Sequence, residues 1–147
     1  MMASRTKVAI LLWTLLALFI GRVVGQLVVW LYAPAFLPPM EAWYSGLMPY
    51  QYLLPVQIVM IVVFAKICLD ISQGVGFWAK PKPRLGLWLR NFGFIYFAGM
   101  IVRYVLRMAW YPEERWTGGT IPIVFHFVLA TYFIILGRYH CRPRHEA

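Results

Sequence analysis

Four long apolar segments separated by shorter polar ones dominate the pattern of this chain. They run from about 8 to 32, 52 to 71, 87 to 110 and 120 to 139. Polarity does not alternate within them, which is typical of helices rather than barrel strands. The first segment would span about 37 Å as a helix, more than the ~30 Å hydrocarbon core of a bilayer. The pattern predicts an all-α integral membrane four-helix bundle, a single domain over residues 1–147.

The connecting segments differ in charge. Basic residues flank the first segment on its N-terminal side, lie between the second and third segments, and follow the fourth. They are Arg5, Lys7, Lys80, Lys82, Arg84, Arg138, Arg142 and Arg144. The connection over 33–51 has no Lys or Arg. The positive-inside rule therefore predicts that both termini are cytoplasmic, in the inner (plasma) membrane of the cell. The first segment is too long for the apolar region of a signal peptide, so we expect it to be retained.

Composition supports this picture. The chain is 62% hydrophobic and only 13% charged, with a mean hydropathy of +0.68, whereas roughly a quarter of a soluble domain is charged. The basic residues behind the net charge of +9 are distributed as the predicted topology requires and form no contiguous basic face. No nucleic-acid partner is therefore expected. The two cysteines, Cys68 and Cys141, form no CxxC motif and fall on the predicted reducing side, where free thiols are expected.

Six polar side chains lie in the outer half of the predicted membrane layer. They are Arg22, Gln26, Gln57, Arg103, Arg107 and His126. Arg22 and Gln26 are four residues apart, as are Arg103 and Arg107, so each pair shares one helix face. Ionisable groups in a membrane are costly and mark candidate functional sites. We predict that Arg22, Arg103 and His126 converge in one outward-facing cavity, with the two glutamines beside them.

The charge of this predicted pocket indicates its ligand. The planar fork of arginine suits phosphate or carboxylate, and inward-facing cations repel each other in a low-dielectric site. No acid lies at that depth, so the negative charge must come from Glu113 or Glu114, from a bound anion or from a partner subunit. We therefore expect a non-catalytic protein that binds an anionic lipid or lipid-like ligand, or that is a subunit of a homo-oligomer or larger membrane complex. The alternative is a transporter or enzyme that acts on a phosphorylated or carboxylated amphiphile, with His126 as its titrating group.

Simpler roles stay open for several of these residues. Arg107 is near enough to the surface to snorkel, Arg103 to pair with a loop glutamate, and Gln57 to bridge helices. Lys66 and Asp70, four residues apart, predict a local ion pair. Gly21 and Gly25 form a GxxxG step that lets another helix approach closely. The aromatic residues near the outer ends predict a belt at the interface; they are Trp43, Tyr44, Tyr50, Tyr52, Trp110, Tyr111 and Trp116.

Other classes lack the residues that they need. Small multidrug transporters also have four helices, but they depend on a glutamate in the first helix, and none is present here. Haem ligation by His126 and His140 would need partner histidines on another helix, and the remaining histidine is His145 in the tail. No Ser/His/Asp arrangement falls within the membrane, and no Cys/His cluster has metal-ligand spacing. We expect no cofactor and no metal.

Overall fold

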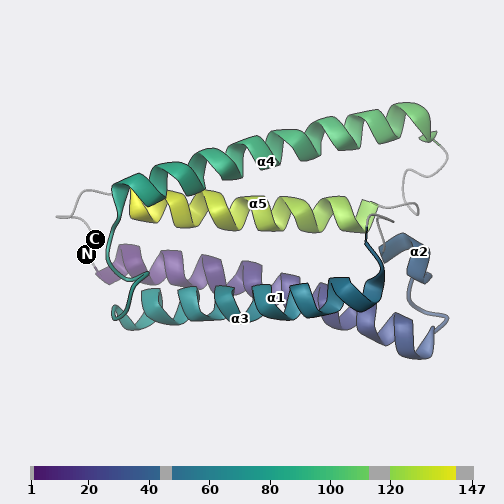
Figure 1. Ribbon diagram of the computed structural model, residues 1–147, viewed down its shortest axis with the longest axis horizontal. Coiled ribbons are helices and arrows are strands. Elements are labelled where there is room, and N and C mark those ends of the chain that lie inside the picture. Colours follow the sequence, from purple (N-terminus) through teal and green to yellow (C-terminus); the bar gives the residue numbers. More distant parts are fainter. Residues whose placement is uncertain (1, 44–47, 113–119, 142–147) are drawn as a thin grey trace.

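The computed structural model describes residues 2–43, 48–112 and 120–141, and within these ranges it contains helices and no strand (Figure 1). The long helices are α1 (Met2–Tyr32), α3 (Tyr50–Gln73), α4 (Pro83–Trp110) and α5 (Thr120–His140), and α2 (Met40–Trp43) is one short turn. Each long helix contains a stretch that is long and apolar enough to cross a membrane. The predicted all-helical class with four membrane-length helices is therefore confirmed.

The helix ends differ from the predicted ones mainly at polar residues. Helix α1 begins at Met2 rather than at 8, and α4 begins at Pro83 rather than at 87. The predicted starts follow the rise in hydropathy, whereas the first turn of each helix is polar and does not raise it. Proline suits this first turn, where its missing N–H would have no helical partner. Gly74 ends α3 in the left-handed conformation, with φ 73°, and its N–H bonds to the Asp70 carbonyl at 2.9 Å.

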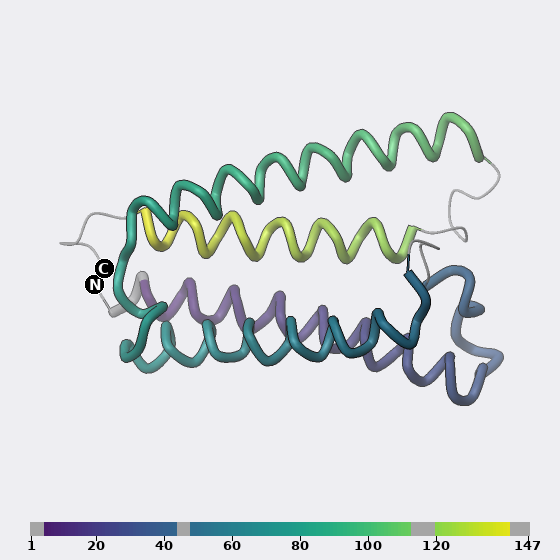
Figure 2. The backbone as a smooth tube through the Cα atoms, in the orientation of Figure 1, coloured from purple at the N-terminus to yellow at the C-terminus, as the bar shows by residue number. Residues whose placement is uncertain are grey.

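The four long helices pack in a row. Backbone contacts join α4 to α5, α5 to α1, and α1 to α3 in the described parts of the chain. Helices α3 and α4 therefore lie at the two edges of the row (Figure 2). The N-terminus, the end of α5 and the α3–α4 connection share one end of the molecule, here called the termini end. The opposite end, here called the distal end, carries α2, the end of α4 and the start of α5.

One apolar core joins α1, α3 and α5. Its fully buried residues recur at intervals of three and four along each helix, which places them on one face. They include Leu12 and Leu16 of α1, Cys68 and Ile71 of α3, and Tyr132, Leu136 and Tyr139 of α5. Phe64 stacks on Tyr132 with ring centroids 4.4 Å apart, and the Tyr132 hydroxyl donates to the Phe64 carbonyl at 3.0 Å. These side chains link α3 to α5 although the backbones of these helices do not approach each other.

Glycines allow α4 to approach α5 closely near the termini end. A Cβ added to Gly137 of α5 would lie 2.7 Å from the Cα of Arg90, and one added to Gly86 of α4 would lie 2.8 Å from the Gly137 carbonyl oxygen. A Cβ on Gly93 would lie 2.9 Å from the backbone nitrogen of Ile134. Any side chain at these positions would separate the two backbones. Closer to the distal end, larger side chains such as Tyr96 and His126 fill the interface, and α4 diverges from α5 (Figure 2).

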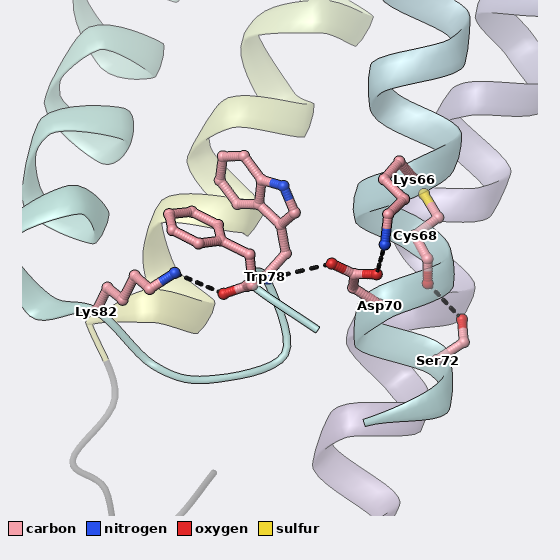
Figure 3. Close-up of polar contacts among 7 residues, drawn as sticks. Lys66, Cys68, Asp70, Ser72, Trp78 and Lys82 are labelled. Atoms are coloured by element: carbon pink, nitrogen blue, oxygen red, sulfur yellow. Dashed lines mark hydrogen bonds and ion pairs between the residues drawn. The ribbon is translucent and has the colours of Figure 1, made fainter. Parts of the chain in front are cut away.

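A polar network fixes the α3–α4 connection at the termini end (Figure 3). Lys66 and Asp70 form the ion pair that the sequence predicts. The buried Asp70 carboxylate also accepts a hydrogen bond from the backbone N–H of Trp78 at 3.3 Å. Lys82 donates to the Phe77 carbonyl at 2.6 Å, and its ammonium lies over the Phe77 ring. Asp70 therefore holds the connection against the end of α3.

The outward faces of α3 and α4 are strongly apolar. Val59 and Val62 of α3 are 61% and 63% exposed, and Trp88 and Ile95 of α4 are 78% and 74% exposed. An apolar helix face of this kind is uncommon on soluble monomers. Hydrocarbon chains of a bilayer would cover it at no cost in hydration, which agrees with a multi-pass membrane protein.

Candidate functional site

A cavity of about 230 Å³ lies among α1, α3 and α5. Among the described residues, three polar side chains line it, namely Arg22 of α1, Gln57 of α3 and His126 of α5. Counted along their helices, these residues lie roughly 9 to 15 Å from the distal end, so they form one layer. Most of the remaining lining is apolar, with Phe19 and Leu129 on the side of the core. The cavity therefore combines a small polar layer with hydrocarbon-like walls.

Arg22 supplies the positive charge of this cavity. Its Nη2 donates to the backbone oxygen of Trp43 at 3.1 Å. Its Nε is buried and has no hydrogen-bond partner among the described residues. No carboxylate of residues 2–43, 48–112 or 120–141 lies within ion-pairing distance of it. Because a neutral carbonyl binds a guanidinium less strongly than a carboxylate or phosphate does, Arg22 retains the capacity to bind an anion.

Two glutamines connect α1 to α3 beside this arginine. The fully buried Gln26 donates from Nε2 to the Trp43 carbonyl at 3.5 Å, and its Oε1 accepts from Gln57 Nε2 at 3.4 Å. Both distances are at the long limit of hydrogen bonding, so both bonds are weak. The Oε1 of Gln57 is buried and has no partner in the described segments. Gln57 thus lines the cavity and keeps one buried acceptor without a partner in these segments, whereas Gln26 lies behind it as a bridge.

His126 lines the cavity and also contacts α4. Its Nδ1 shares a hydrogen bond with the hydroxyl of Tyr96, and the two rings meet edge to face with centroids 5.7 Å apart. Tyr96 was not among the residues that the sequence singled out, because a tyrosine within an aromatic-rich helix carries no distinguishing signal.

The two other predicted arginines lie outside this cavity. Arg103 and Arg107 are half-buried on α4, and neither lines the cavity that Arg22 and His126 share. Arg103 is near enough to His126 and Tyr96 for its charge to act on both, whereas Arg107 lies in the last turn of α4. The structure thus brings together Arg22, Gln57 and His126, with Gln26 behind them and Arg103 nearby. Glu113 and Glu114, proposed as possible partners, lie outside the described residues.

Trp43 packs on α1 on the distal side of Arg22, a role that the sequence did not predict. It is buried rather than exposed at an interface, and its indole Nε1 donates to the Pro38 carbonyl at 3.0 Å. Its ring packs on Gly25, where an added Cβ would lie 2.8 Å from the ring. Gly25 therefore receives a tryptophan ring instead of another helix, and Gly21 has no atom within 4 Å of its added Cβ. Of the other residues in the predicted aromatic belt, Tyr50 is also buried, whereas Tyr52 and Trp110 are 65% and 71% exposed.

This arrangement is suited to binding. It offers an arginine that has no acidic partner among the described residues, a glutamine, a histidine and apolar walls. Within the described residues, no group of three His, Cys, Asp or Glu side chains is placed to hold a metal ion. Comparisons with protein-family models, with curated proteins and with solved structures find no match for this chain.

Proposed function

We propose that the protein is a non-catalytic multi-pass membrane protein that binds an anionic lipid or lipid-like amphiphile at Arg22. The observation that carries the proposal is the half-buried guanidinium of Arg22, which lines an apolar cavity and is bonded to the neutral carbonyl of Trp43. An unpaired arginine near mid-membrane is unfavourable by at least ~2.5 kcal/mol, even on lenient insertion scales. A bound phosphate or carboxylate would remove much of that cost, and the apolar walls would accept the hydrocarbon part of the same molecule.

The same charge also fits a protein partner. In a larger membrane complex or a homo-oligomer, an acidic side chain of another subunit would take the place of the lipid anion. We favour the lipid because the cavity walls around Arg22 are mostly apolar, and an acidic side chain would bring little hydrocarbon to fill them.

Native mass spectrometry of the detergent-extracted protein tests this proposal. We expect a phosphatidylglycerol adduct that survives collision energies at which phosphatidylcholine is lost, because only the former carries a net negative charge for Arg22. Equal retention of the two lipids would contradict lipid-anion binding. A stoichiometric co-purifying polypeptide, with no lipid adduct, would support the complex-subunit role in its place.

A transporter or enzyme that acts on an anionic amphiphile is the second candidate. The observation in its favour is that His126, a group able to exchange protons, lines the cavity and bonds to Tyr96. The variant His126→Gln separates the candidates in the same experiment. In this variant, a passive binder would keep its selectivity for phosphatidylglycerol. A transporter or enzyme would still bind its ligand but would no longer transport or convert it, so its activity in the cell would be lost.

We also propose that the protein lies in the inner membrane of the cell and that its termini end faces the cytoplasm. The support is the charge of the two ends. Arg5 lies beside Gly74 at the termini end, and Lys80 and Lys82 belong to the α3–α4 connection there. The connection between α1 and α3 at the distal end has no Lys or Arg, so the positive-inside rule assigns it to the outside.

Cysteine labelling of whole cells tests this orientation. Phe36 is 84% exposed at the distal end, and Val75 is 68% exposed at the termini end. In a Cys141→Ser background, where the remaining Cys68 is fully buried, a membrane-impermeant maleimide should label Phe36→Cys in intact cells. It should label Val75→Cys only after permeabilisation. The reverse pattern would show that the orientation is inverted.

A further inference from the structure

A second hollow lies on the other side of Arg22. This open groove of about 440 Å³ is lined on α1 by Thr14, Ala17, Leu18 and Gly21, and it is bordered by Trp43. Its α1 residues lie on a different face of the helix from Phe19, which lines the first cavity. Of the residues that the structure describes, Arg22 and Phe125 line both hollows. They therefore form the partition between the cavity and the groove.

The partition fills a window between α1 and α5. On the termini side of it, the core packs α1 against α5 through residues such as Phe19 and Leu129. On the distal side, α2 contacts both helices, and Trp43 packs with Val29 and Ile121. Arg22 and Phe125 lie between these two layers. Arg22 is therefore a charged residue that borders both hollows.

The chemistry of each hollow points to hydrocarbon. The cavity walls are mostly apolar, and the groove presents small and apolar side chains on an exposed face of α1. In a bilayer, an open apolar groove of this kind is filled by an acyl chain, since water at that depth would lose its hydrogen bonds. The cation common to both hollows is Arg22, so the anion and the two hydrocarbon sites meet at one residue.

We infer that the ligand is a two-chain anionic lipid that straddles the window. Its phosphate binds Arg22, one acyl chain enters the cavity between α1, α3 and α5, and the other occupies the groove along α1. This inference rests on the proposed function and adds to it the number of chains and the place of each. A single-chain lipid would use only one hollow, and free phosphate neither.

Gly21 provides a selective way to block the groove. No atom lies within 4 Å of a Cβ added there, and Gly21 lines the groove, so the side chain of Gly21→Leu would occupy groove volume. Gly99 on α4 is the matched control, because its added Cβ also meets nothing within 4 Å and it does not line either hollow. Gly99→Leu makes the same chemical change on another exposed helix face.

The experiment compares the dissociation constants of three probes. They are phosphatidylglycerol, its single-chain lyso form and inorganic phosphate, each measured by native mass spectrometry on the full chain. Gly21→Leu should weaken binding of the two-chain lipid about tenfold, the effect expected when a chain must leave a filled site. It should leave the dissociation constant of the lyso form unchanged, and Gly99→Leu should change the dissociation constant of neither lipid.

Each of the other outcomes contradicts a specific part of the proposal. If Gly21→Leu affects neither lipid while Arg22→Gln weakens both, the straddling geometry is wrong and lipid binding at Arg22 stands. Equal weakening of both lipids by Gly21→Leu also overturns the assignment of one chain to each hollow. If inorganic phosphate binds as tightly as the lipids, the ligand is a free anion. If no anionic probe depends on Arg22, the proposed function itself fails.

Discussion

Arg22→Gln should reduce the affinity for phosphatidylglycerol roughly tenfold to hundredfold. A hydrogen bond to a charged group contributes about 1.5–3 kcal/mol, and each 1.4 kcal/mol changes a dissociation constant tenfold. Glutamine keeps a donor for the Trp43 carbonyl but loses the charge, so the loss reports the electrostatic part of binding. The measurement is the dissociation constant of the lipid in titrations followed by native mass spectrometry.

Arg107→Gln is the control for this prediction. It removes the same charge from the last turn of α4, and Arg107 does not line the cavity. The affinity should change little, since that position lies outside the site. Equal losses in the two variants would mean that the overall positive charge, rather than the cavity, attracts the lipid.

The stability of a second variant, Arg22→Leu, should depend on the ligand. In the delipidated protein, this change removes a half-buried cation that has no carboxylate partner among the described residues, so the melting temperature should stay equal or rise. With saturating phosphatidylglycerol, the wild type gains stability from binding and the variant does not. The order of the two melting temperatures should therefore reverse on adding lipid. A lower melting temperature of the variant in both conditions would indicate a purely structural role.

Gly137→Val should destabilise the fold by about 1–3 kcal/mol or more. Its side chain would begin 2.7 Å from the Cα of Arg90, and a backbone cannot yield as a flexible side chain can. Helix α4 would have to separate from α5, its only backbone neighbour among the described helices. The free energy of unfolding can be measured by titration with sodium dodecyl sulfate, followed by circular dichroism.

Gly99→Ala provides the comparison. Its added Cβ meets no atom within 4 Å, and alanine favours a helix interior by about 1 kcal/mol over glycine. This variant should be as stable as the wild type or slightly more stable. If Gly137→Val were equally well tolerated, the close approach of α4 and α5 would not contribute to stability.

The site was only partly accessible from the sequence. Depth along each helix follows from counting residues, so Arg22, Gln57 and His126 could be assigned to one layer before their cavity was known. The rotation of each helix about its axis could not be assigned in this way. Arg103 belongs to the same predicted layer, yet it lies outside the cavity because α4 packs on α5 at the edge of the row.

The sequence by itself determined the four membrane-length helices and the local Lys66–Asp70 pair, because hydropathy and spacings of four residues act within one segment. Only the tertiary structure decided which neighbours meet. It placed Trp43 on Gly25, Tyr96 against His126, and the backbone of Arg90 against Gly137. These contacts join segments far apart in the chain, and they depend on how large and small side chains fit across helices. No pattern along a single helix contains that information.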